Sequence, residues 1–443
     1  MNSKIRVNIL FPFLTLSGYG RRSLDLLRAL IELKWDEWDF HIASLRFGQS
    51  PFIQLDTTDP INAKIMSRTF DIQQVLSAPG EIGIFCTVPS ELIDVRIAKY
   101  QILFTAGIES TVCSPEFIKG YNNMDLVITS SEHAMNVFKN TTYQEKDQQG
   151  RVIGDLKINK PGRVLFEGVD LSTYDRKNTH LFDFPEVKEN WNFLVHGMLL
   201  PGDFTSPYGH DRKNILTTIK VFLEAFKNKK NPPGLILKVN AGNYSVADRE
   251  RVFKKIGEVR ESVEAETLPN VYLIHGQLTD DELIGLYQSP KVKAMLSVAA
   301  EGWGRAPIEF SCATSKPLVV APYGGTLDYI NREFVTMVGG SLQQMHPSAR
   351  NQFLIENSQI FYPDINQFII ALRDVYENYS KHEQMGKRQA HHARSGFSLD
   401  KMKEKLSQIL KESLPVFSIP QPLVLPKLRK APPVEEYLEA IPV

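Results

Sequence analysis

The sequence has little cysteine, no excess charge of either sign and no long apolar run. Its 443 residues include 3 cysteines, Cys86, Cys113 and Cys312, and without a Cys-x-x-Cys pair neither a disulfide framework nor a zinc site is expected. With 51 basic and 51 acidic residues, the chain is not basic overall, which disfavours electrostatic binding of nucleic acid. No apolar stretch approaches the roughly 20 residues that cross a bilayer. We therefore expect a cytoplasmic protein with no transmembrane segment, no bound metal and buried, reduced cysteines.

Short apolar runs alternate with amphipathic stretches along most of the chain. Runs that are apolar on both faces and separated by helical segments are typical of parallel sheets. The strands expected in the first half are 7–13, 40–47, 82–88, 101–106, 126–130 and 163–166. Those expected in the second half are 192–196, 235–239, 271–275, 294–300 and 317–321. The pattern predicts an α/β protein with two Rossmann-like, doubly wound halves facing each other across a cleft.

The predicted boundaries follow from changes in this pattern. The N-terminal half spans 1–185, the C-terminal half 186–396, and a terminal helix 397–414. The remaining segment, 415–443, has seven prolines in 29 residues, which excludes a regular helix or a central strand. Residues 139–163 are polar and show no periodicity, so they read as an irregular insertion.

The loop that begins at Glu301 is the strongest candidate for a ligand site. It follows an expected strand and leads into a helix, and ligands of parallel sheets bind at such strand ends. Gly302 and Gly304 permit close backbone approach, and the helix start offers free N–H groups to a phosphate. Glu301 and Glu309 could accept hydrogen bonds from sugar hydroxyls. They are too far apart for a glycosidase pair, and the alternative is that they are ordinary solvated charges.

Two further loops carry weaker signals. Arg212 and Lys213 stand at a loop–helix junction, where two cations suit a diphosphate, although a solvated basic turn is the alternative. Gly18 and Gly20 follow the first strand and could approach a ligand from the other side of the cleft. This loop matches neither the dinucleotide fingerprint nor a P-loop.

These motifs together resemble the donor-site block of retaining GT-B glycosyltransferases, the large family that includes sucrose synthases and bacterial sugar transferases. The resemblance covers residues 5–410 and is most specific in the second half. It rests on Glu301-Gly-x-Gly with Glu309, and on five further segments in matching order: 17–20, 125–131, 168–170, 212–214 and 317–326. Segment 276–282 also fits.

The resemblance implies a role for each matching residue. Glu301 would hold hydroxyls of the donor sugar and Glu309 the ribose, while Arg212 and Lys213 would neutralise the leaving diphosphate. The remaining residues would bind the donor through their backbone: Gly302, Gly304 and Arg305 at the diphosphate, Gly276 and Leu278 at the base, and Gly18 and Gly20 from the N-terminal half. No metal or cofactor is implied, and the nucleotide sugar is a co-substrate.

One position departs from the family pattern. Many relatives have a histidine after the fourth or fifth strand of the first half, where this chain has Glu109. A carboxylate there could orient or deprotonate the acceptor hydroxyl, or it could only cap the helix beginning near Ser114. For His196 and His275, at strand ends, we expect hydrogen-bonded structural roles rather than catalysis, and His133 is a weak candidate.

The resemblance implies a retaining hexosyl- or pentosyltransferase that moves sugar from a nucleotide diphosphate to an acceptor hydroxyl. The acceptor could be a glycan, lipid, protein or modified nucleic acid, including a hydroxymethylated DNA base. A non-catalytic GT-B module that binds sugars or partners is the alternative from another class. Sequence alone identifies neither the sugar, the base nor the oligomeric state.

Overall fold

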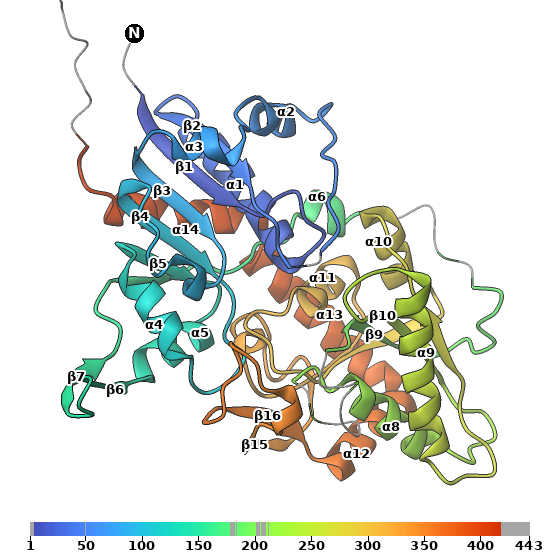
Figure 1. Ribbon diagram of the computed structural model, residues 1–443. Helices are drawn as coiled ribbons and strands as arrows, with labels where there is room; N and C mark the ends of the chain where they lie inside the picture. The colour runs from blue at the N-terminus through green and yellow to red at the C-terminus, as the bar shows by residue number, and fades with distance from the viewer. Residues whose placement is uncertain are drawn as a thin grey trace, which may run out of the picture.

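The computed structural model describes residues 4–48, 50–177, 182, 184–200, 204, 210 and 212–417, and the proline-rich segment beyond 417 lies outside them. Two six-stranded sheets, each parallel throughout, form two halves that stand side by side (Figure 1). The predicted α/β class with two doubly wound halves is confirmed. Within the described ranges, no helix is both long and apolar enough to cross a membrane.

The N-terminal sheet has the strand order β2-β1-β3-β4-β5-β8. Its strands are β1 Ile5–Phe11, β2 Trp38–Ser44, β3 Gly80–Cys86, β4 Ala98–Thr105, β5 Leu126–Thr129 and β8 Gly162–Val164, and all but the edge strand β8 carry buried apolar side chains. The helices of this half are α1 Gly18–Lys34, α2 Pro60–Ser67, α3 Ile72–Leu76, α4 Pro115–Asn122 and α5 Glu132–Asn140. A short helix, α6 Leu171–Tyr174, leads toward the second half.

The C-terminal sheet repeats this design with the order β11-β10-β9-β12-β13-β14. Its strands are β9 Asn192–Met198, β10 Gly234–Asn240, β11 Val271–Ile274, β12 Val292–Ser297, β13 Leu318–Val320 and β14 Thr336–Met337. Its helices are α8 Ile215–Phe226, α9 Val246–Glu261, α10 Asp280–Gln288, α11 Arg305–Ala313, α12 Ile365–Glu377 and α13 Tyr379–Gly396. A capping box joins Thr279 and Glu282 at the start of α10, and the three cysteines are free and buried, as expected.

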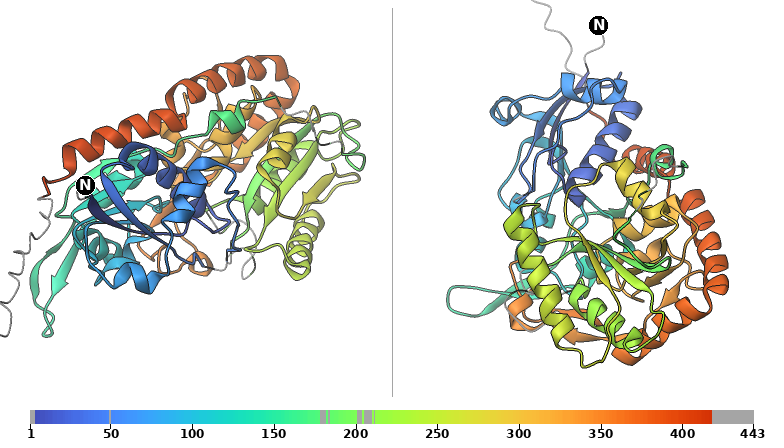
Figure 2. Two further views of the ribbon diagram at one scale, coloured as in Figure 1. Left: turned by 90° about the horizontal axis from the view of Figure 1, so that it is seen from above. Right: turned by 90° about the vertical axis from the view of Figure 1, so that its right-hand side faces the viewer.

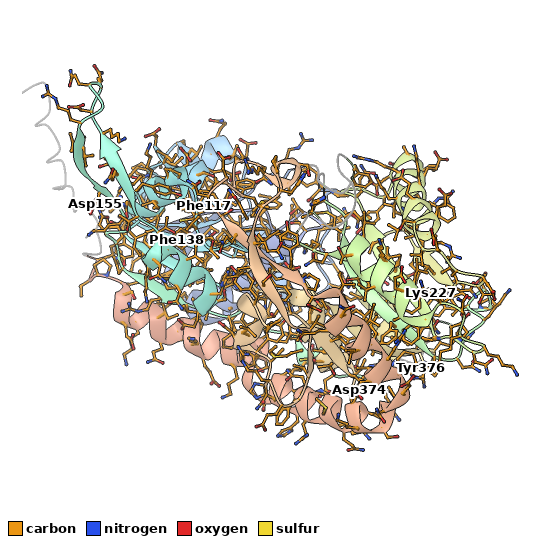
Figure 3. All side chains as sticks on the ribbon, turned by 90° about the horizontal axis from the view of Figure 1, so that it is seen from below. Phe117, Phe138, Asp155, Lys227, Asp374 and Tyr376 are labelled. Atoms are coloured by element: carbon orange, nitrogen blue, oxygen red, sulfur yellow. The ribbon has the colours of Figure 1, made fainter. Side chains whose placement is uncertain are left out.

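Two hairpins were not foreseen. In the segment predicted to be irregular, β6 Tyr143–Lys146 pairs with β7 Val152–Leu156, and this hairpin, with Asp155 on it, projects from the body (Figure 3). Its side chains are mostly exposed, so it has no buried face to impose a periodic pattern. In the second half, β15 Gly340–Gln344 pairs with β16 Gln359–Pro363, and Phe353 of the intervening loop lies 5.8 Å from Phe117 of α4, ring centre to ring centre.

The last helix returns to the first half. Helices α13 and α14 (Leu399–Ser413) run along one side of both halves (Figure 2). The backbone N–H of Val169 donates to the carbonyl of Phe397, and the carbonyl of Val169 accepts from the N–H of Leu399. These bonds join the two places where the chain passes between the halves. The apolar face of α14 joins the core of the N-terminal half through Met402, Leu406, Ile409 and Leu410. The terminal helix therefore ties the two halves together.

We expect Leu406→Ala to lower the free energy of unfolding by about 2–5 kcal/mol, because this side chain is fully buried and its removal leaves a cavity. Leu406 is 0% exposed. Chemical denaturation followed by circular dichroism measures the change. Ile370→Ala is the matched control, since Ile370 is 65% exposed and its truncation should change stability little. Equal effects of the two variants would contradict the packing of α14.

Candidate functional site

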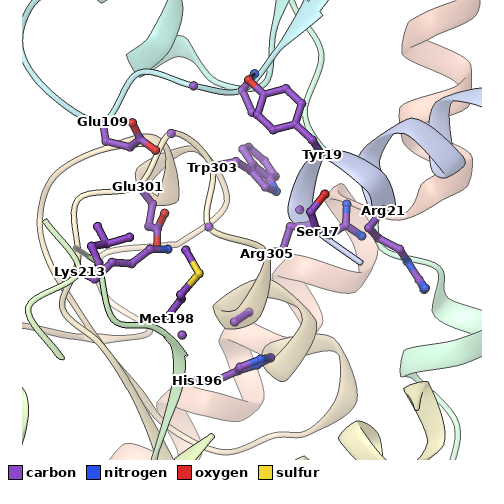
Figure 4. Close-up of a pocket in the computed structure, with 18 of the residues that line it drawn as sticks. Ser17, Tyr19, Arg21, Glu109, His196, Met198, Lys213, Glu301, Trp303 and Arg305 are labelled. Atoms are coloured by element: carbon purple, nitrogen blue, oxygen red, sulfur yellow. Dashed lines mark hydrogen bonds and ion pairs between the residues drawn. The ribbon is translucent and has the colours of Figure 1, made fainter. Parts of the chain in front are cut away.

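A cavity of about 800 Å³ lies between the two halves. Its wall is formed by the segments that follow β1, β4, β9, β10, β11 and β12, and Figure 4 shows residues of both halves facing it. Carboxyl ends of parallel strands are where ligands bind in such sheets. The fold thus places one shared cavity at the ends of both sheets.

The Glu301 loop crosses this cavity in a fixed conformation. The carbonyl of Glu301 accepts a hydrogen bond from Gly325 N at 2.8 Å, and that of Gly304 accepts one from the Tyr329 hydroxyl at 2.7 Å. The Ser131 hydroxyl, from the N-terminal half, donates to the Gly302 carbonyl at 2.6 Å. The loop therefore belongs to the boundary between the halves.

Two positions of this loop require glycine, each for a different reason. Gly304 has a φ of +85° directly before α11, a conformation that disfavours other residues. At Gly302 a Cβ atom would lie 2.1 Å from the carbonyl oxygen of Ala106 in the first half. Close approach of the two halves thus requires glycine at 302.

Linked ion pairs connect the first half to this loop. Arg212 pairs with Glu109 at 2.7 Å and with Glu301 at 3.1 Å, and Lys213 pairs with the other oxygen of Glu301 at 2.5 Å. Burial would raise the pKa of Glu301, but Lys213 and Arg212 outweigh burial and hold that pKa below its ordinary value. The Glu301 carboxylate is therefore ionised and hydrogen-bonded to both cations.

A second charge cluster lies at the start of α11. The guanidinium of Arg305 pairs with three buried carboxylates at 3.0–3.1 Å, namely Asp25, Glu167 and Glu309. We call these four residues the Arg305 cluster. Asp25 belongs to α1, Glu167 follows β8, and Glu309 is one turn along α11. Burial opposes the charge on Arg305, but the three carboxylates raise the pKa of Arg305 well above its ordinary value.

The structure brings most of the predicted site residues together. The residues that line the cavity are Gly18, Glu109, Arg212, Lys213, Leu278, Glu301, Gly302, Gly304, Arg305 and Glu309. Gly20 and Gly276 do not line this cavity. A Cβ atom at Gly20 would lie 2.0 Å from the Thr15 carbonyl oxygen, and the carbonyl of Gly276 accepts a hydrogen bond from Lys238.

The alternative role of Glu109 as a helix cap is wrong. Ser114 itself caps α4, since its hydroxyl accepts a hydrogen bond from Phe117 N. Both strand-end histidines are hydrogen-bonded, as predicted: His196 Nδ1 lies 2.7 Å from the Tyr287 hydroxyl, and His275 Nε2 lies 2.8 Å from Asp248. Burial lowers the pKa of His196 to about 3, so this histidine is neutral.

Sequence reasoning missed several residues of the cavity wall, among them Tyr19, Trp303 and Lys238. Tyr19 accepts a hydrogen bond from Ala106 N at 3.1 Å, and its ring stacks on Phe47. Trp303 is 2% exposed and packs against Tyr329. Lys238 lies on β10 among apolar neighbours, and a lone lysine in a buried strand was a signal that could have found it.

His133 lies beside the site rather than in its wall. Its ring meets that of Tyr323 edge-on, with ring centres 4.9 Å apart. Burial lowers the pKa of His133 to about 4. The ring is therefore neutral, and it packs against an aromatic neighbour.

Comparisons with known proteins find matches in fold but none in sequence. No protein-family model matches the chain, and no curated protein matches it in a sequence comparison. Solved structures match it along nearly its whole length. HepE of Anabaena, in complex with UDP and glucose, is 15% identical with a TM-score of 0.56, and the match covers 92% of this chain and 100% of that one.

Two further structures give the same result. Sucrose-phosphate synthase of Thermosynechococcus elongatus is 12% identical with a TM-score of 0.58, and the match covers 92% of this chain and 99% of that one. A glycosyltransferase of Rickettsia africae is 16% identical with a TM-score of 0.54, covering 92% and 98%. The chain therefore has the GT-B fold. The fold that the sequence resemblance implied is confirmed.

Replacing Arg305 should destabilise the protein strongly at neutral pH. We expect Arg305→Ala to lower the free energy of unfolding by about 3–5 kcal/mol at pH 7, because three buried carboxylates lose their cation. Asp25 and Glu167 keep longer contacts to Arg21 and Arg22, at 3.9 and 3.8 Å. Because the shorter pairs to Arg305 are lost, the buried carboxylates should take up protons more readily than in the unfolded chain, so the deficit should shrink as pH falls from 7 to 5.5. Chemical denaturation at both pH values measures it.

The control for this variant is Arg96→Ala, which removes a surface arginine that is 48% exposed and pairs with Asp125. Surface ion pairs contribute about 0–1 kcal/mol. A deficit of that size for Arg305→Ala, or one that does not change with pH, would contradict the importance of the Arg305 cluster.

Proposed function

We propose that this protein is a metal-independent, retaining glycosyltransferase that moves a sugar from a nucleoside diphosphate donor to an acceptor hydroxyl. The observation that carries the proposal is the Glu301 loop, where Glu301, Lys213 and Arg212 meet at the start of α11 inside a cavity shared by both halves. HepE, which shares the fold, was solved with UDP and glucose, and this supports a nucleotide sugar as the ligand class.

The donor would lie mainly on the C-terminal half. Glu301, as an ionised carboxylate, accepts hydrogen bonds from sugar hydroxyls. Arg212, Lys213 and the free N–H groups at the start of α11 stabilise the negative charge that grows on the diphosphate as the bond from sugar C1 to phosphate oxygen breaks. Such preset charges act without reorganisation in a site that excludes water.

The acceptor would approach from the N-terminal half, where Glu109 faces the cavity. Its hydroxyl oxygen forms the new bond to C1 on the face that the diphosphate leaves, and Glu109 orients that hydroxyl and takes up its proton. Because Arg212 contacts both Glu109 and Glu301, it joins the acceptor side to the donor side.

Glu309, the predicted ribose contact, is already engaged in an ion pair. One oxygen of Glu309 pairs with Arg305 at 3.0 Å, and its side chain is 8% exposed. The carboxylate lines the cavity, so its other oxygen is the atom that would accept a ribose hydroxyl. Glu309 is therefore the proposed ligand of the ribose.

Binding is tested by a thermal-shift screen of UDP, GDP and ADP, each free and with its sugar attached. A ligand at 100 times its dissociation constant should add about 2.7 kcal/mol of stability, and isothermal titration calorimetry should confirm the affinity. Parallel runs with EDTA test independence from metal. If none of the nucleotides shifts the unfolding transition, the proposed function is wrong.

With the donor known, Glu301→Ala should lower the turnover number by about 10²–10³-fold, the usual effect of removing one preorganised polar group from a site. The measurement is product release with saturating donor, with circular dichroism to check folding. Glu404→Ala is the control, because Glu404 is a surface residue of α14, 64% exposed. Turnover of Glu301→Ala at the level of this control would remove Glu301 from the active site.

A further inference from the structure

Lys238 is a buried cation in the floor of the cavity. It belongs to β10, and its strand neighbours Leu237 and Val239 are fully buried apolar residues. Lys238 itself is 4% exposed, and its Nζ donates to the Gly276 carbonyl at 2.7 Å. The ammonium also lies 5.2 Å from the centre of the Tyr244 ring. Lys238 and Tyr244 both line the cavity.

Lys238 differs from the other cations of the cavity wall in its partners. Arg21 pairs with Asp280, Lys213 with Glu301, and Arg305 with three carboxylates. Over the described ranges, no carboxylate forms an ion pair with Lys238, and burial lowers the pKa of Lys238 to about 8. An ammonium has three N–H donors and no acceptor, and Gly276 takes one of them. The other donors need oxygen atoms that a ligand can supply.

The place of Lys238 in the sheet shows which part of a donor it meets. The strand order is β10-β9-β12, and α11 follows β12. Neighbouring strands are about 4.7–4.9 Å apart, so β10 lies roughly 10 Å to the side of β12. With the diphosphate at the start of α11, the nucleoside extends toward β10. There the Tyr244 ring, Leu278 and Gln277 line the same cavity as Lys238, and they can flank a flat base.

We propose that Lys238 selects the base of the donor by donating a hydrogen bond to an exocyclic carbonyl oxygen. This inference rests on the proposed function. A carbonyl oxygen accepts from the ammonium, whereas an amino group at the same ring position presents only donors to it. Lys238 therefore favours uracil over cytosine, and a 6-oxopurine over adenine. The substrate class is a nucleoside diphosphate sugar with an oxo base.

Two nucleotide pairs test this preference, UDP against CDP and IDP against ADP. The members of each pair differ in one exocyclic group and in whether the ring nitrogen beside it carries a proton. Titration calorimetry measures their affinity for the full-length wild-type protein and for Lys238→Met, which keeps an unbranched, slightly shorter side chain and has no donor. For the ring size that binds, the wild type should prefer the oxo member by about tenfold or more. In Lys238→Met the preference should disappear through loss of affinity for the oxo nucleotide alone.

Lys238→Gln provides a second, independent readout, because its amide both donates and accepts. It should raise the affinity for the amino member relative to the oxo member. Lys387→Met is the control, since Lys387 is 49% exposed on α13 and should leave all affinities unchanged. Thermal melting of each variant checks that it is folded.

Two results would overturn the inference while leaving the proposed function intact. One is an oxo preference that persists in Lys238→Met. The other is an equal loss of affinity for both members of a pair and for inorganic diphosphate, which would make Lys238 a phosphate ligand. If the wild-type protein binds no nucleoside diphosphate, the proposed function fails, and the inference fails with it.

Discussion

The ion pairs of Arg305 are the interaction on which the arrangement of the site depends. One guanidinium at the start of α11 faces carboxylates from α1, from the segment after β8 and from its own helix. Removing these charges from water costs several kcal/mol per ion, and that cost is offset only when every partner is in place. The cluster therefore fixes α11 against the N-terminal half. The direction of α11 in turn sets where the Glu301 loop enters the cavity.

The ion pairs of Arg212 depend on the position of α11, which the Arg305 cluster fixes. Arg212 reaches Glu109 across the cavity only because the two halves are close, and Gly302 allows that closeness by leaving room for the Ala106 carbonyl. Ser131 then holds the loop from the same side. Cations expected to meet a diphosphate are thus already balanced by two carboxylates. Acidic and basic groups are equal in number in this network, as they are in the whole chain. A ligand must therefore compete with existing ion pairs.

Sequence reasoning located what is encoded locally and missed what depends on distant partners. The apolar runs gave both sheets, and the strand–Gly–helix pattern around Glu301 gave the central loop of the site. The terminal helix was predicted, but Met402 and Leu406 do not reveal which half it packs against. Asp25 and Glu167 meet Arg305 across more than a hundred residues of chain. No spacing rule connects such positions, so the Arg305 cluster became visible only in the structure.

The most informative local signals were polar residues in strands that otherwise bury apolar side chains. A buried parallel strand favours apolar side chains on both faces, and Lys238 in β10 and His196 in β9 both break that rule. Their positions are paired across the two strands, and both side chains line the cavity. Sequences accept such local conflicts chiefly at functional sites, because elsewhere the cost of burying a polar group is not repaid. Lys238 and His196 therefore mark one level of this sheet as a candidate ligand position, to the side of the α11 start where the diphosphate is proposed to bind.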